Sequence, residues 1–164
     1  MLAIWLTDYI GNPNNYEIGM RPEQKPAWVH SLNNVTDLLT LPLHSTVILD
    51  DVSQLISIYN YGSKQTSQAL TDAVALCRHK QLTIIATGQA TGPVNIRLFE
   101  TLETFFWKVP PLAADFQRPG VRKQVKAAQQ AFYGKTLQWQ QSHVFVWSTK
   151  FIGILGYDAR SVAR

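Results

Sequence analysis

The sequence predicts an α/β fold, with helices flanking a parallel sheet and a β-hairpin at the C-terminal end. Two short apolar runs, at 46–49 (TVIL) and 82–87 (LTIIAT), have the unbroken hydrophobicity of strands that are buried on both faces. Between them, residues 66–80 place apolar side chains at helical spacing. A strand, a helix and a second strand in this order are typical of parallel pairing.

The elements before the first run are predicted from shorter patterns. Residues 2–7 (LAIWLT) form another apolar run and predict a buried strand. Residues 11–15 (GNPNN) are rich in turn formers and predict a turn. Prolines in and before residues 16–30 predict irregular structure there. The apolar spacing of residues 31–41 predicts a helix that Pro42 stops.

The elements after the second run complete the predicted fold. Residues 95–102 predict a short helix, and residues 104–109 predict a further strand that Pro110 ends. Residues 121–132 predict an amphipathic helix whose apolar stripe is Val121, Val125, Ala128 and Phe132. Two apolar segments within residues 144–157 predict strands joined by a tight turn.

Composition indicates a globular chain with a real core. The chain has 164 residues, of which 46% are hydrophobic and 16% charged, and its net charge is +4. We therefore expect a single domain over 1–164 and find the charge compatible with a polyanionic partner. One cysteine, Cys77, excludes an internal disulfide and a cysteine-based zinc site. We expect no membrane segment and no secretory signal, and hence a cytoplasmic location.

Two adjacent carboxylates follow the first apolar run directly. Asp50 and Asp51 are predicted at the carboxyl edge of the sheet, where open α/β folds bind their ligands. A carboxylate pair there can hold a hydrated Mg²⁺ ion and orient a water molecule, which is the chemistry of nucleoside triphosphate hydrolysis. The same residues can instead cap the helix that follows, because aspartate is a favoured N-cap. Residues 46–51 alone leave both interpretations open.

Several segments occur in an order that points to one family of proteins. They are LAIWLTD, TVILDD, a helix ending in Cys-Arg-His, LTIIATGQ, NIRLFE and FFWKV. This order resembles the ATPase core of the FtsK–HerA superfamily of P-loop motors, in particular viral DNA-packaging ATPases and zonula occludens toxin-like phage assembly proteins. The resemblance covers residues 2–110, about two thirds of the chain. It implies a partial P-loop NTPase-type parallel sheet, followed at 111–164 by a basic helix and the C-terminal strands.

The resemblance implies roles for the two carboxylates. Asp50 corresponds to the Walker B acid that is associated, indirectly, with the Mg²⁺ of bound ATP. Asp51 corresponds to the adjacent acid that orients the attacking water. Glutamate is more common at that position in the superfamily, so the shorter aspartate implies slower or geometrically altered hydrolysis.

Four further residues acquire roles from the same resemblance. Gln89 corresponds to the polar sensor of the γ-phosphate. Asp8 corresponds to the acid that commonly ends the strand after the phosphate-loop helix. Arg78 and Arg97 are candidates for the arginine offered to the nucleotide of a neighbouring subunit, where it stabilises charge on the phosphoryl oxygens. Such an arginine implies a homo-oligomeric ring.

The phosphate-binding motif of this superfamily, G-x-x-x-x-G-K-[ST], is absent from the sequence. Its nearest echo, at 134–136 (GKT), has Gln129 where the first glycine belongs and follows a helical pattern instead of a strand. Gly134 is better explained as a helix C-cap. In the superfamily the loop precedes the strand predicted at 2–7. We therefore expect a truncated, internally started or degenerate protein, with an open sheet edge where the missing strand belongs.

Three functions follow from these observations. The first is an ATPase domain, truncated at its N-terminus, of a motor that packages or translocates double-stranded or single-stranded DNA, in the host cytoplasm or on a virion. Its basic residues could contact DNA phosphates; they are Arg118, Arg122, Lys123 and Lys126. The second is a structural or interaction module that has lost nucleotide binding. The third is an unrelated α/β domain in which the two aspartates are helix caps.

Overall fold

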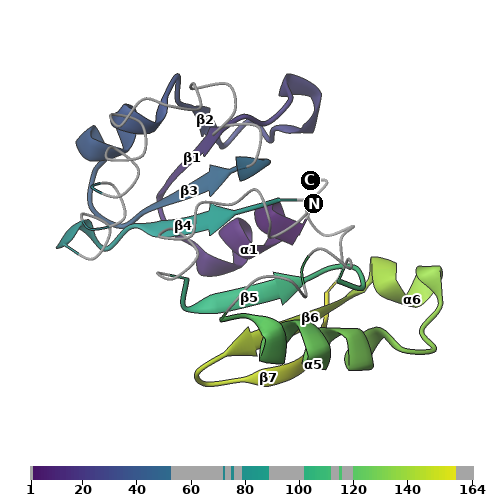
Figure 1. The fold of residues 1–164 in the computed structure, drawn as a ribbon. Helices are drawn as coiled ribbons and strands as arrows, with labels where there is room; N and C mark the ends of the chain where they lie inside the picture. Colours follow the sequence, from purple (N-terminus) through teal and green to yellow (C-terminus); the bar gives the residue numbers. More distant parts are fainter. Residues whose placement is uncertain are drawn as a thin grey trace. The chain divides into compact units, whose positions relative to one another are not determined.

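The chain forms two compact units, each built around its own sheet, in a computed structural model (Figure 1). The first unit comprises residues 1–89 with 94–98, and the second comprises 90–93 with 99–164. The structure describes residues 2–52, 72, 75, 79–88, 102–111, 115 and 120–157.

The sheet of the first unit has four described strands, all parallel, in the order β2-β1-β3-β4. The strands are β1 (Asn14–Ile18), β2 (His30–Ser31), β3 (Ser45–Leu49) and β4 (Thr83–Ala86). β3 is paired on both sides, and all five of its residues are buried. The unbroken apolar run at 46–49 reflects this environment, because a parallel strand covered on both faces has no solvent-facing positions. The predicted α/β fold with a parallel sheet is confirmed.

One face of this sheet carries the main apolar cluster. Side chains alternate between the two faces along a strand, so Val47 and Leu49 share a face with Ile18 of the neighbouring β1. These residues pack with Leu38, which belongs to the 3₁₀ helix η2 (Val35–Thr40). All four side chains are at most 2% exposed. The cluster fixes β3 between its neighbours and thereby fixes where the strand ends.

Residues 2–7, predicted as a strand, belong instead to helix α1 (Leu2–Ile10). α1 packs against β3 and buries Ile4 and Thr7, which lie three residues apart on one side of the helix. The Thr7 hydroxyl donates to the carbonyl of Ala3 four residues earlier, at 2.9 Å, as helical threonines do. The prediction was wrong because a short apolar run has the same pattern in a buried helix and in a buried strand.

Residues 14–18 (NNYEI), predicted as turn and irregular structure, form β1. β1 lies between β2 and β3 and is hydrogen-bonded to both. This pairing satisfies its backbone, so the strand forms although its sequence is mostly polar and lacks the apolar pattern of a strand. The remaining part of the segment contains only one short helix among its described elements, the 3₁₀ helix η1 (Pro22–Gln24).

Residues 31–41, predicted as one helix, begin with the end of β2 and continue as η2. Asn34 caps η2: its side chain accepts from the Thr36 amide at 3.0 Å, and the Asp37 carboxylate accepts from the Asn34 amide at 3.1 Å. This capping box starts the helix four residues later than predicted. The helix stops before Pro42, as expected.

The second unit contains an antiparallel sheet in the order β5-β6-β7. Its elements are β5 (Thr104–Trp107), α5 (Arg122–Phe132), α6 (Leu137–Gln141), β6 (His143–Ser148) and β7 (Ile152–Gly156). The pair β6–β7 confirms the predicted C-terminal hairpin. β5 pairs with β6, so this strand joins the hairpin sheet instead of continuing the parallel sheet.

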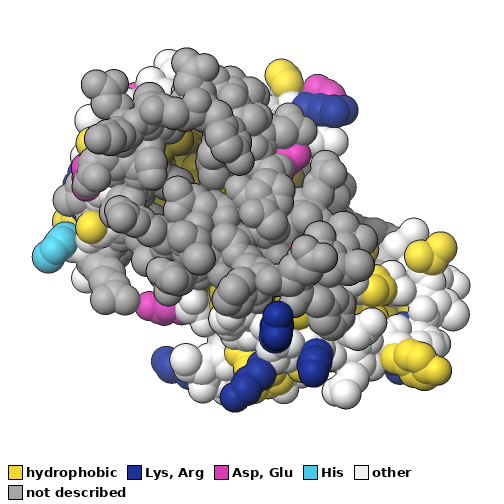
Figure 2. All heavy atoms as spheres, in the orientation of Figure 1, with side chains coloured by type: hydrophobic (Ala, Val, Ile, Leu, Met, Phe, Trp, Pro, Cys, Tyr) yellow, Lys and Arg dark blue, Asp and Glu magenta, His cyan; other side chains and the backbone are white. Residues whose placement is uncertain are grey.

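Helix α5 confirms the amphipathic helix predicted at 121–132. Its buried residues are Val125, Ala128 and Phe132, and Lys and Arg side chains gather over it at the surface (Figure 2). Gly134 follows the helix with φ of +69°, and the Lys135 amide donates to the Phe132 carbonyl at 3.1 Å. Gly134 is therefore a helix C-terminal cap, and the GKT echo is not a phosphate loop.

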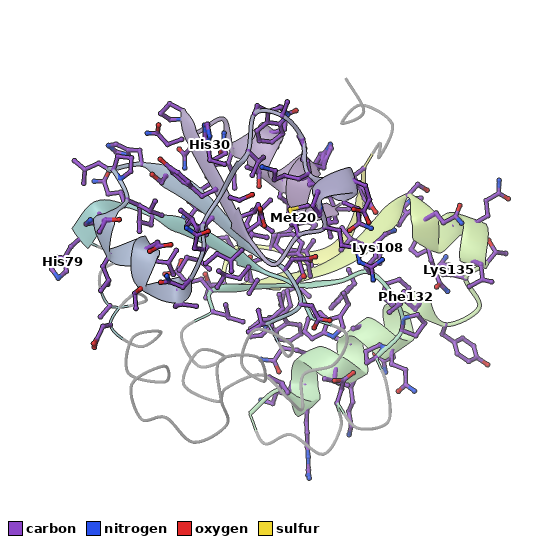
Figure 3. All side chains as sticks on the ribbon, turned by 90° about the horizontal axis from the view of Figure 1, so that it is seen from above. Met20, His30, His79, Lys108, Phe132 and Lys135 are labelled. Atoms are coloured by element: carbon purple, nitrogen blue, oxygen red, sulfur yellow. The ribbon has the colours of Figure 1, made fainter. Side chains whose placement is uncertain are left out.

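Lys108 follows β5 and ties it to α6 (Figure 3). Its ammonium group donates to the carbonyls of Gln140 and His143 and lies 4.7 Å from the ring centroid of Tyr157. Burial lowers the pKa of Lys108 and raises the pKa of Tyr157. The two carbonyls sit at the end of α6 and the start of β6, so Lys108 fixes the turn between them.

Two predicted helices lie largely outside the described residues. Only four residues of the helix predicted at 66–80 are described, and all four are helical. The helix predicted at 95–102 lies outside the described residues except for its last position. Within the described part of the chain, no helix is long and apolar enough to cross a membrane.

Truncating the central strand tests this account of the core. Leu49→Ala should lower the free energy of unfolding by about 2–5 kcal/mol, because Leu49 is 1% exposed and its removal leaves a cavity. Leu43→Ala makes the same chemical change at a side chain that is 57% exposed, and should stay within about 0.5 kcal/mol of the wild type. Urea unfolding measures both, and equal losses would contradict the assignment of Leu49 to the core.

Candidate functional site

Asp50 and Thr87 lie side by side at the carboxyl edge of the parallel sheet. Asp50 is the first residue after β3 and Thr87 the first after β4, and the last residues of the two strands, Leu49 and Ala86, are paired. The Thr87 hydroxyl donates to Asp50 Oδ1 at 2.6 Å. The hydrogen bond is short, as expected when the acceptor is an ionised carboxylate, and it fixes the direction of the Asp50 side chain.

Thr87 also holds the backbone where the chain leaves β3. Its hydroxyl oxygen accepts from the Asp51 amide and its carbonyl accepts from the Val52 amide, both at 2.9 Å. On the other side, the Asp50 amide donates to the carbonyl of Ile18, also at 2.9 Å. The Asp50 carboxylate and the backbone of residues 50–52 are therefore fixed by hydrogen bonds to groups at the ends of both neighbouring strands.

Asp51 adopts a left-handed backbone conformation, with φ of +45°. This conformation costs about 1–2 kcal/mol for a residue with a Cβ, although aspartate and asparagine tolerate it better than most. Strained residues of this kind concentrate at functional sites. An ordinary N-cap is extended, so the backbone of Asp51 differs from that of the helix-cap interpretation.

The oxygen atoms at this edge suit a hard cation. Asp50, Asp51 and Thr87 are all half-buried residues, so this edge of the sheet is partly exposed to solvent. Mg²⁺ prefers oxygen ligands and commonly keeps several waters while using one or two carboxylates. Among the described residues, no group of three or more His, Cys, Asp or Glu is gathered around a metal position. The residues present thus fit a hydrated Mg²⁺ ion bound through Asp50.

Glu17 is a buried carboxylate near this edge that sequence analysis missed. It is 3% exposed, and its Oε2 accepts from the Met20 amide at 2.9 Å. Glu17 pairs with Ile48 on β3, so these two side chains lie on the same face of the sheet, two residues before the chain reaches Asp50. The missed signal was a single glutamate in the polar segment NNYEI, which the prolines around it made look irregular.

The remaining predicted site residues have different outcomes. Asp8 lies on α1 and is exposed, so it does not end a strand and the predicted position was wrong. Gln89, Arg78 and Arg97 lie outside the described residues. Thr87, which makes the hydrogen bonds at the site, was not predicted, because the sequence assigns the polar role at the end of this strand to Gln89, two positions later.

Comparison with known proteins gives a relationship in fold. No family model matches the sequence, and no curated protein matches it. The fold is similar to that of the genome packaging NTPase B204 from Sulfolobus turreted icosahedral virus 2. The structure of that protein with ATP-gammaS has 12% sequence identity to this chain and a TM-score of 0.62. The match covers 94% of this chain and 86% of that one. The structure of the same protein with AMP has 12% identity and a TM-score of 0.57, and the match covers 96% of this chain and 87% of that one. The chain therefore has an NTPase-type α/β fold.

Removing the Thr87 hydroxyl tests its place in the site. Thr87→Val should lower the free energy of unfolding by about 1–3 kcal/mol, because the Asp50 carboxylate and the Asp51 amide each lose a partner. Thr87→Ser keeps the hydroxyl and should retain most of the stability. Chemical unfolding measures both variants, and a valine variant as stable as the serine one would remove Thr87 from this role.

The strain at Asp51 makes a separate prediction. Asp51→Gly should be more stable than Asp51→Ala by about 1 kcal/mol, because only glycine adopts a positive φ without a steric cost. At Asp50, where φ is not positive, the same pair of substitutions should give alanine the advantage. Thermal unfolding of the four variants decides the matter. Alanine preferred at both positions would contradict the left-handed conformation.

Proposed function

We propose that this chain is part of the ATPase domain of a motor that couples Mg-ATP hydrolysis to the packaging or translocation of DNA. The observation that carries the proposal is the pair of aspartates after β3, whose Asp50 carboxylate and Asp51 amide are bound by Thr87 at the end of the adjacent strand. The fold supports it, because the similar viral genome packaging NTPase was seen with ATP-gammaS and with AMP.

In this proposal each residue of the edge has a separate task. Asp50 binds the hydrated Mg²⁺, which when bound neutralises charge on the phosphate oxygens. Thr87 keeps the Asp50 carboxylate aimed in one direction. Asp51 accepts a hydrogen bond from the attacking water and orients it. Gln89 senses the γ-phosphate.

The proposal needs a phosphate-binding segment that residues 1–164 do not contain, because the G-x-x-x-x-G-K-[ST] motif is absent from them. Without backbone amides and a lysine to hold the phosphates, the carboxylate edge alone would bind ATP weakly. The proposal therefore assigns that segment to sequence outside residues 1–164. An arginine from a neighbouring subunit, Arg78 or Arg97, completes the site in a homo-oligomeric ring.

A second candidate function is a structural or interaction module that keeps the fold without hydrolysing ATP. The absent phosphate motif favours it, as does aspartate at position 51, where related motors more often have glutamate. The two candidates differ in one observable: only the ATPase has an in-frame segment encoding an apolar strand and a GK[ST] loop upstream of Met1.

The decisive experiment compares catalysis with nucleotide binding. In the protein that includes such an upstream segment, Asp51→Asn should lower kcat by about 100-fold or more while ATP binding is retained, because orienting and deprotonating a nucleophile contributes about 10²–10⁴-fold. Glu23→Gln, at an exposed position of η1, is the control and should leave kcat unchanged. Residues 1–164 alone should not hydrolyse ATP.

Two results would count against the proposal. Full turnover in Asp51→Asn would remove Asp51 from its assigned role. A genome with no upstream loop, together with no detectable ATP binding by calorimetry, would favour the interaction module.

A further inference from the structure

Positive charge is concentrated in one segment of the second unit. Residues 116–157 contain six Lys and Arg side chains and no Asp or Glu. The net charge of the whole chain is only +4, so the rest of the chain is slightly acidic. With its histidine counted as neutral, this run of 42 residues therefore has a net charge of +6.

Helix α5 presents part of this charge as one surface. Its apolar residues Val125 and Ala128 are fully buried, and the helix packs against β6. The opposite side carries Arg122, Lys123 and Lys126, all exposed. Figure 2 shows Lys and Arg side chains gathered over α5. We call these three residues the α5 cationic face.

The spacing of these residues lets them act together. Arg122 and Lys126 are four residues apart, so they neighbour each other on the helix surface, about 6 Å apart along the axis. Lys123 is three residues before Lys126 and so neighbours it as well. The other exposed or half-buried side chains of the helix are neutral, so no carboxylate on α5 competes for the three cations.

We propose that the α5 cationic face binds the phosphate backbone of a nucleic acid. Regularly spaced phosphates are the partner that a row of exposed lysine and arginine side chains fits best, and each contact releases condensed counterions. This inference deepens the DNA-handling part of the proposed function, but it depends only on charge and burial within the second unit.

An anionic membrane is the rival partner and fits the surface less well. A helix that lies on a bilayer inserts an apolar face beside its cations. In α5 that face is already used inside the protein, because Val125, Ala128 and Phe132 are at most 3% exposed. Tyr133 and Leu137, which are exposed beyond the end of the helix, do not form an apolar strip along it.

The test measures binding of a fluorescein-labelled 20-base-pair duplex by anisotropy, as a function of salt. The double variant Lys123→Gln/Lys126→Gln should raise Kd about tenfold or more at low salt, and should reduce the slope of log K against log salt by about 2, since each phosphate contact contributes about 0.9. Arg21→Gln/Lys150→Gln removes the same charge from two other exposed positions and should leave the slope unchanged.

The outcomes separate this inference from the proposed function. Duplex binding with an unchanged salt slope in the α5 variant would overturn the inference, and so would a wild type that binds phosphatidylserine vesicles but not the duplex. Nucleotide binding should be the same in both double variants. Loss of duplex binding in the α5 variant, together with full turnover in Asp51→Asn, would leave the inference standing while the catalytic assignment fails.

Discussion

The geometry of the candidate site depends on the side chain of Thr87, which lies between the two aspartates and the neighbouring strand. The Thr87 hydroxyl donates to Asp50 and accepts from the Asp51 amide, and its carbonyl accepts from Val52. A hydroxyl can do both because it is donor and acceptor at once. Parallel pairing of β3 with β4 brings Thr87 to this position, since the two strands end at the same edge. The Asp50 carboxylate and the backbone of Asp51 are thus held by the register of the sheet.

The register in turn depends on the apolar cluster behind β3. Val47 and Leu49 are buried against Ile18 and Leu38, so a shift by one residue would turn them to the other face of the sheet. The same shift would move Asp50 away from Thr87. Packing on one face of the sheet therefore sets the geometry of the polar edge. Strain at Asp51 can persist because the surrounding hydrogen bonds and the buried Val52 over-determine its backbone.

Elements with long or regular patterns could be predicted from sequence, and short polar ones could not. β3 and β4 were evident as apolar runs, α5 from its stripe at 3.6-residue spacing, and the hairpin from two apolar segments around a turn. β1 was not, because a polar strand owes its existence to partners far away in the sequence. Residues 2–7 of α1 were predicted as a strand, since a run of five apolar residues and a threonine is too short to show a helical or a strand period.

The sequence likewise predicted only part of the candidate site. Asp50 and Asp51 were located because charged residues at the end of an apolar run are conspicuous, and the structure brings them to the expected edge. Thr87 was hidden inside the predicted strand, where a threonine is ordinary. Glu17 was hidden because its strand was. A side chain whose role is to bind a residue on a neighbouring strand cannot be predicted from the sequence until the pairing of the strands is known.

Acidic and basic side chains are distributed unequally between the two units, which the packing of the two sheets does not require. The first unit holds seven acidic and six basic side chains, whereas the second unit holds four acidic and nine basic ones. A carboxylate edge that binds a cation gains from an acidic setting, and a face that binds phosphates gains from a basic one. Mixing the two sets of charges would weaken both, because each cation near Asp50 would compete with the metal and each carboxylate near α5 would repel the nucleic acid. The difference in charge between the units, −1 for the first and +5 for the second, suits the function that we propose, in which the first unit binds a metal-bound nucleotide and the second a polyanion.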